Sequence, residues 1–185
     1  ADQIEVQNSH YPSRPSFSDT SPAMYYSAVL KDKKYSVILK RDSQTGAETQ
    51  LTDFRSFKPS VSPDGKYILC FAADGGEKKF DPAGGLRLTL YSLADNKIVK
   101  QFERLSSRDL PLIEWKRDSS GFYFVEQEKE KNVLLERDLD GKTVKTIKRW
   151  GEGRVFQMAL SNDGKRLFVE KGEDVVSVLK FENAG

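Results

Sequence analysis

The sequence predicts an all-β fold: a β-propeller of about four four-stranded antiparallel blades, forming one domain over residues 1–185. Three observations predict this fold. A strand–turn–strand unit recurs along the chain, each full repeat adds a second hairpin, and no segment keeps the helical period of 3.6 residues. The recurrence is the most specific of the three, because its spacing of about 45 residues is the length of one propeller blade.

The recurring unit is an apolar pair, a tight turn and a strand. Its copies cover residues 15–26, 59–69, 112–124 and 157–169, and the third copy is interpreted as having one extra turn residue. The equivalent turn positions hold Thr20, Asp64, Asp118 and Asp163, at intervals of 44, 54 and 45 residues. Pro63 fixes φ and Gly65 accepts a left-handed conformation, which favours a hairpin at this turn. We therefore expect repeats at about 13–56, 57–109, 110–154 and 155–185.

The strands within a repeat differ in polarity. The strand after each turn is apolar on both faces, as over residues 67–73, which is typical of a strand buried on both sides. The last strand of each second hairpin is polar and alternating, as over residues 143–147, which is typical of an outermost strand facing water. Each full repeat is therefore expected to have four strands, ordered from inside to outside.

The fourth repeat lacks an outer strand. Strands are expected at residues 158–160, 166–170 and 175–181, after which the sequence ends. Residues 3–7 have strand composition, so we expect them to pair with the strand at 175–181, within the chain or across a partner. The same pattern arises if the chain is part of a larger propeller, and this alternative stays open.

Composition excludes several classes of function. The 30 Lys and Arg nearly balance the 28 Asp and Glu, which argues against a nucleic-acid-coating protein. No apolar run has the ~18–20 residues of a membrane helix. The single cysteine, Cys70, excludes an internal disulfide and a Cys-rich zinc site, and the single histidine, His10, excludes a multi-histidine metal centre. We expect no metal and no cofactor.

The turn motifs carry a resemblance to a known family. The segments Ser62-Pro63-Asp64-Gly65-Lys66, Asn162-Asp163-Gly164-Lys165 and residues 118–124 resemble the TolB-type β-propeller repeat, over about residues 12–183. The resemblance implies a non-enzymatic protein-binding platform, in the bacterial periplasm or cell envelope. Similar repeats build the non-catalytic propeller of prolyl-oligopeptidase-like enzymes. Four repeats are fewer than is typical of the family.

Four kinds of residue that could carry chemistry have structural explanations in this sequence. His10 lies in a polar stretch before the first repeat and is expected to be a solvated linker residue. Cys70 lies within an apolar strand without a nearby cation, so we expect a buried, inert thiol. Trp115 occupies the position of Phe17, Val61 and Leu160 in the other copies and is expected in the core. The turn aspartates form hydrogen bonds within their turns rather than a catalytic carboxylate set.

A glycine-flanked loop enlarges the second repeat. Gly75-Gly76 and Gly84-Gly85 surround a segment containing Lys78, Lys79 and Phe80. No helix is expected to follow, so the loop lacks the helix N-terminus of a phosphate-binding loop. It is either a tolerated insertion or a loop that contacts a partner.

An arginine precedes the first strand of every repeat. These residues are Arg14, Arg55, Arg108 and Arg154. In a propeller such connections gather around one mouth of the central channel, where four guanidinium groups would attract carboxylates or phosphates, or an acidic partner segment. The alternative is that each arginine pairs with a nearby carboxylate, such as Asp53, Asp109 or Glu152.

These observations predict a non-catalytic binding or scaffold propeller that mediates protein–protein interaction. Three alternatives stay open: a half-propeller that assembles with a second copy or another chain, a sensory or gating propeller of a larger enzyme or regulator, and a propeller enzyme such as a lactonase or lyase. The enzyme needs a metal or several acid–base groups at the channel, which this sequence does not offer. We expect a protein partner, and neither nucleic-acid binding nor membrane insertion.

Overall fold

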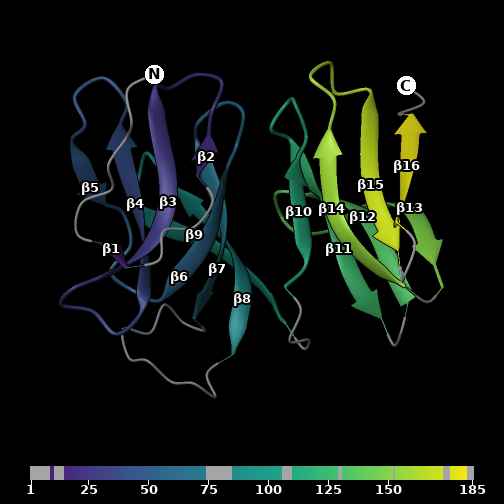
Figure 1. Ribbon diagram of the computed structural model, residues 1–185, viewed down its shortest axis with the longest axis horizontal. Helices are drawn as coiled ribbons and strands as arrows, with labels where there is room; N and C mark the ends of the chain where they lie inside the picture. The colour runs from purple at the N-terminus through teal and green to yellow at the C-terminus, as the bar shows by residue number, and fades with distance from the viewer. Residues whose placement is uncertain are drawn as a thin grey trace. The chain divides into compact units, whose positions relative to one another are not determined.

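The computed structural model describes residues 9–10, 15–73, 85–105, 110–128, 131–151, 153–172 and 176–182. Every regular element in these ranges is a β-strand, and the ranges contain no helix. The described residues therefore include no helix long and apolar enough to cross a membrane. The chain divides into two compact units, Ala1–Leu105 and Ser106–Gly185, called here the N-terminal and C-terminal units. Each unit holds two antiparallel sheets (Figure 1).

The first two sheets form the N-terminal unit. The first sheet contains β1 (Ser9–His10), β2 (Ser16–Phe17), β3 (Ala23–Leu30), β4 (Ser36–Asp42) and β5 (Glu48–Gln50). Both β1 and β2 pair with β3 on the edge away from β4, so the innermost strand consists of two short pieces. The second sheet follows the chain order β6 (Ser56–Val61), β7 (Tyr67–Ala73), β8 (Leu86–Ser92) and β9 (Lys97–Arg104).

The third and fourth sheets form the C-terminal unit. The third sheet has the order β10 (Leu112–Trp115), β11 (Gly121–Glu128), β12 (Lys131–Asp138) and β13 (Thr143–Trp150). The fourth has β14 (Arg154–Leu160), β15 (Arg166–Gly172) and β16 (Val176–Glu182). The all-β antiparallel architecture is confirmed, including the three strands expected near the C-terminus. The segment expected to supply the fourth strand, residues 3–7, lies outside the described residues.

A hydrophobic core fills the space between the two sheets of each unit. Between the first and second sheets, the core includes Tyr25, Ile38, Val61, Ile68 and Cys70. Between the third and fourth sheets it includes Tyr123, Leu134, Trp150, Val155, Leu167 and Val169. Along β7 the residues of both faces are buried, as the apolar run predicted.

The turn of the third sheet corrects an expectation. The Lys116 N–H donates to the Gly121 carbonyl at 3.0 Å, the same five-residue spacing as from Ser62 to Tyr67 at 2.9 Å, so this turn has no extra residue. Ser119, with φ of 57°, occupies the left-handed position that Gly65 fills elsewhere. Gly121 instead begins β11, where a Cβ atom would lie 2.1 Å from the Arg137 carbonyl oxygen. Gly121 is therefore required by the close approach of β12.

Candidate functional site

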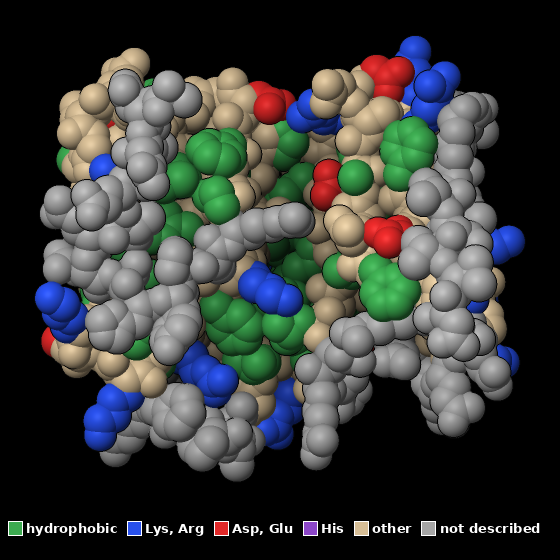
Figure 2. Space-filling view, in the orientation of Figure 1, with side chains coloured by type: hydrophobic (Ala, Val, Ile, Leu, Met, Phe, Trp, Pro, Cys, Tyr) green, Lys and Arg blue, Asp and Glu red, His purple; other side chains and the backbone are tan. Residues whose placement is uncertain are grey.

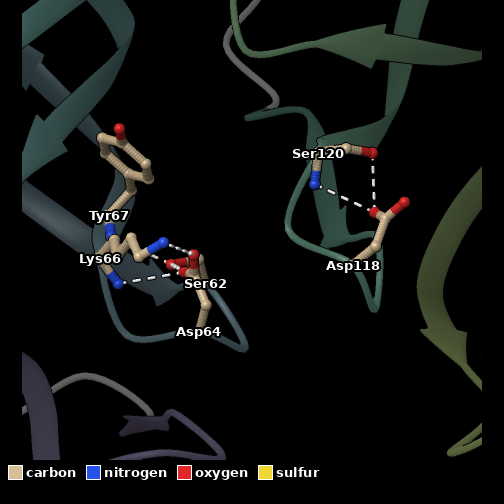
Figure 3. A network of polar contacts seen from close by, with 6 residues as sticks. All are labelled: Ser62, Asp64, Lys66, Tyr67, Asp118 and Ser120. Carbon is tan, nitrogen blue, oxygen red and sulfur yellow. Dashed lines mark hydrogen bonds and ion pairs between the residues drawn. The ribbon is translucent and has the colours of Figure 1, made fainter.

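In the second, third and fourth sheets, the turn between the first two strands is built around an aspartate. The Ser62 hydroxyl donates to Asp64 Oδ1 at 2.7 Å, the Lys66 N–H donates to the same oxygen at 3.1 Å, and the Tyr67 N–H donates to Ser62 Oγ at 3.0 Å (Figure 3). Partial burial raises the pKa of Asp64, but the hydrogen bonds from Ser62 and Lys66 outweigh burial and hold it below the ordinary value. This carboxylate is committed to the turn.

The two other aspartate turns repeat this chemistry. Ser161 donates to Asp163 Oδ1 at 2.6 Å, and the hydroxyl and N–H of Ser120 donate to Asp118 Oδ1 at 2.7 and 3.0 Å (Figure 3). These hydrogen bonds lower the pKa of both carboxyl groups. The interpretation of these aspartates as turn-forming residues is confirmed. The third sheet has Lys116 in place of the turn serine, and its Nζ lies 2.9 Å from Glu136 Oε1.

Neighbouring sheets within each unit are joined by hydrogen bonds at equivalent positions. The Val61 N–H donates to Ser16 Oγ at 2.9 Å, and the Asp19 N–H donates to the Pro63 carbonyl at 3.1 Å. In the C-terminal unit the Leu160 N–H donates to Glu114 Oε1 at 3.4 Å. There the Arg117 Nε–H donates to the Asn162 carbonyl at 3.0 Å. Within each unit, the innermost strand of the later sheet (β6 or β14) is thus fixed against the sheet that precedes it.

Glu114 lies on β10, the innermost strand of the third sheet, and its side chain is half-buried. Burial raises its pKa, while the Leu160 N–H and the Arg117 cation partly oppose that rise. The sequence reasoning missed this residue because it lies within an apolar strand, where a carboxylate has no motif to mark it. Glu114 occupies the position in the third repeat that Ser16 occupies in the first. This equivalence was the signal in the sequence that could have marked Glu114 as an acceptor.

Exposed side chains occur on the innermost strands of both units. Phe17 on β2 is 58% exposed, whereas its counterparts Val61 and Trp115 are 4% and 5% exposed. The expectation that Trp115 lies in the core is confirmed, whereas Phe17 at the equivalent position of the first sheet is exposed. Val61 is buried because it packs against the first sheet. Figure 2 shows hydrophobic side chains reaching the surface of each unit.

Backbone irregularities present further side chains on these strands. A register shift in β6 falls between Phe57 and Ser60, and Lys58 within it has φ of 50° and is exposed. A shift in β14 leaves Phe156 without a partner on β15, and this side chain is 40% exposed. A bulge turns its extra residue out of the ladder, which explains both exposures. The innermost strands therefore offer Phe17, Lys58 and Phe156 as contact residues.

Most of the predicted site residues lie outside the described ranges. These are Arg14, Arg108, Lys78, Lys79 and Phe80. Arg154 begins β14, but its side chain is not described. Arg55 is half-buried, and its carbonyl accepts the Ala73 N–H at 2.9 Å. The ring of arginines stays a prediction.

His10 and Cys70 have defined places. His10 pairs with Val29 in the first sheet, so the interpretation of this residue as part of a linker is wrong. Cys70 is buried, and burial raises the pKa of its thiol to about 12, which confirms the expected inert thiol. Within the residues that the structure describes, no group of three His, Cys, Asp or Glu side chains has an arrangement that would hold a metal ion.

The chain is similar in structure to several solved propellers. TolB from Acinetobacter baumannii has 20% identity and a TM-score of 0.72, over 95% of this chain and 42% of that one. A structure from a study of two prolyl endopeptidases has 20% identity and a TM-score of 0.68, over 98% of this chain and 29% of that one. The β-propeller domain of the Trilobed protease from Pyrococcus furiosus has 16% identity and a TM-score of 0.61, over 97% and 56%. This chain thus spans less than two thirds of each.

Sequence comparison adds no relative to these structures. No family model matches the chain, and no curated protein matches it. The likeness therefore concerns the fold.

Proposed function

Proceeding from the TolB-type β-propeller fold of this chain, we propose that it is a non-catalytic protein-binding module of a bacterial envelope. Its partner contacts the exposed Phe17 side chain on the innermost strand of the first sheet. The observation that carries the proposal is the exposure of Phe17 at a position that is buried in two other sheets. An exposed aromatic side chain on a rigid strand is a common anchor in protein interfaces.

The absence of catalysis in this proposal is supported by the roles of the reactive groups. The turn aspartates accept hydrogen bonds within their turns, Glu114 accepts one from the next sheet, and Cys70 is buried as a thiol. A nucleophile or general base needs an accessible group with an activating neighbour. The described candidates are instead committed to structure.

Selection of a displayed peptide library on the purified chain tests the proposal. The expected result is a set of peptides whose binding is lost in the Phe17→Ser variant and kept in Val99→Ser. Val99 is a suitable control because it is half exposed but lies on the outer strand β9. Selected peptides that bind the Phe17→Ser variant as tightly as the unaltered chain would refute the proposal.

The predicted arginine mouth gives this proposal a second test. Replacing Arg55 and Arg108 by Ala should weaken binding of an acidic partner and reduce its dependence on salt. Unchanged affinity across the salt series would rule out a contribution from these arginines.

Assembly into a larger ring is a second candidate function. It is favoured by the chain's coverage of 42% of TolB and 29% of the endopeptidase chain. The ring would be completed by a second copy or by other blades. Light scattering distinguishes these cases, because a single copy has a mass of 21.0 kDa.

A propeller that accompanies an enzyme is a third candidate, and the peptidase structures among the neighbours favour it. Under this proposal the isolated chain has no hydrolytic activity of its own. The purified chain would instead be an enzyme if it turned over aminoacyl ester substrates and if a mutation in the chain abolished that turnover.

A further inference from the structure

The outer strand of the third sheet is rich in cations. Residues 141–151 contain Lys142, Lys145, Lys148 and Arg149 but no Asp or Glu. The equivalent strands differ: β5 (Glu48–Gln50) has no cation, and β9 carries Glu103 among its cations. Of these three outer strands, β13 therefore carries the strongest excess of positive charge. The whole chain has a net charge of only +2.

The lysines of this strand are not neutralised by the neighbouring strand. Lys145 lies opposite Glu136 in the register, but the Glu136 carboxylate is already 2.9 Å from Lys116 Nζ. Lys145 and Lys148 are both exposed, and neither forms an ion pair with any residue that the structure describes. Two lysine charges thus face solvent without a carboxylate partner from the described residues.

An apolar side chain lies between these charges. Val144 is 63% exposed, the highest value for a large hydrophobic residue in the described part of the chain. Thr143 pairs with Arg137 and Lys145 with Glu136, so Val144 is the extra residue of a β-bulge. A bulged residue leaves the hydrogen-bonded ladder, which accounts for the exposure of Val144. We name Val144, Lys145 and Lys148 the β13 strip.

The shape of the strand indicates how a partner would contact it. A second register shift lies between the residues opposite Leu134 and Leu135, so β13 has two bulges within eight residues. Bulges twist an edge strand and disturb the alignment of its free N–H and C=O groups, which opposes the addition of another strand. A partner would therefore contact the side chains of the β13 strip rather than extend the sheet.

We propose that the β13 strip binds an acidic protein segment that carries an apolar side chain between its carboxylates. The carboxylates pair with Lys145 and Lys148, and the apolar side chain covers Val144. Charge complementarity selects an anionic partner, and the exposed valine selects a protein over a simple polyanion. A single-stranded nucleic acid is disfavoured because the strip has no exposed aromatic side chain on which bases would stack; Trp150 is buried.

This inference rests on the proposed protein-binding function but uses a different surface. Its test is independent of the library selection, because Phe17 belongs to β2, an innermost strand of the first sheet. If binding at the β13 strip failed, the result of the library selection at Phe17 would be unchanged. If the library selection failed, the test of the β13 strip would likewise be unchanged.

The experiment measures fluorescence anisotropy of a short synthetic peptide with glutamates on both sides of one leucine. The Lys145→Glu/Lys148→Glu variant should lower affinity by about tenfold or more, because it removes two attractions and adds two repulsions. Val144→Ser should lower it about threefold through lost apolar contact. The matched substitutions Lys97→Glu and Val99→Ser on β9 should leave affinity within about twofold. Equal unfolding midpoints establish that all four variants fold.

Four results would overturn the inference. The peptide fails to bind the unaltered chain, the double charge reversal leaves its affinity unchanged, the β9 variants weaken it as much as the β13 variants, or a single-stranded oligonucleotide of equal charge binds as tightly. Weaker binding when glutamine replaces the peptide's glutamates, and when serine replaces its leucine, would support it. Affinity should also fall with salt.

Discussion

The interface between the sheets of the N-terminal unit and the interface in the C-terminal unit use the same positions with different chemistry. In the N-terminal unit the innermost strands are joined through the neutral Ser16 hydroxyl, and the turns through the main-chain N–H of Asp19. In the C-terminal unit the corresponding donors and acceptors belong to Arg117 and Glu114. The fold thus requires a hydrogen bond at each position but not a particular side chain.

This difference has a physical consequence. Neutral hydrogen bonds respond little to pH and salt, whereas a half-buried carboxylate responds to both and the charge of an arginine responds to salt. We therefore expect the two units to share an architecture but to differ in how solution conditions affect their stability. The predictions below test that difference.

The largest loss of stability is expected at Gly65 and Gly164, the turn glycines that contact the turn of the preceding sheet in the same unit. In Gly65→Ala the new Cβ lies 2.7 Å from Thr20 Oγ1 and the backbone has φ of +70°, so we expect a loss of about 2 kcal/mol. In Gly164→Ala the φ is +72° but the nearest atom, Arg117 Cγ, lies at 3.1 Å on a flexible side chain, so we expect about 1 kcal/mol. Urea unfolding measures both, and equal losses would contradict the proposed contrast.

Removal of the neutral acceptor comes next. Ser16→Ala leaves the N–H of the buried Val61 without its acceptor, which should cost about 1 kcal/mol. The loss should be constant between acidic and neutral pH, because no titrating group takes part. A loss that varies with pH would show that the N-terminal interface contains a charged contribution. Urea unfolding at several pH values provides the measurement.

Glu114 gives the opposite expectation. Burial raises its pKa, so the native carboxyl group holds its proton more tightly than the unfolded one. The resulting stability is present below the ordinary glutamate pKa of about 4.3 and is lost as pH rises through the native value. Gln cannot ionise but retains an acceptor for Leu160. Glu114→Gln should therefore gain stability relative to the unaltered chain as pH rises above about 4.3, and parallel stability profiles would contradict it.

The smallest effect is expected from Arg117→Ala. The side chain is exposed and donates to the Asn162 carbonyl at 3.0 Å, so its loss should cost no more than about 0.5 kcal/mol. Arg117 also lowers the pKa of Glu114, so the variant should raise that pKa further. An NMR titration of the Glu114 carboxyl carbon measures the change, and an unchanged midpoint would remove Arg117 from the electrostatics of this interface.

The strand order and the turns could be predicted from the sequence because they depend on local signals. Pro63, Asp64 and Gly65 specify the turn, and the apolar run that follows specifies burial on both faces. The third turn was misread because Ser119 takes the left-handed conformation, while Gly121 serves the close approach of another strand. A glycine in the sequence does not reveal which of these two requirements it meets.

The exposed residues depended on tertiary information. Phe17 resembles Trp115 in its local sequence, yet Phe17 is exposed and Trp115 is buried, so the local sequence does not decide burial at this position. The bulges at Lys58, Val144 and Phe156 arise from the register between paired strands. No turn motif or glycine at these residues marks the bulges in the sequence. The candidate contact surfaces therefore emerged only with the structure.

Cys70 makes the separation of the first two sheets observable in time. It is the only cysteine of the chain, and it lies in the core shared by Tyr25, Ile38 and Ile68. A thiol reagent reaches it only during openings of that core, so the labelling rate reports the frequency of those openings. Mass spectrometry would then follow the dynamics of one interface through a single modified atom, in the unaltered protein and without an introduced probe.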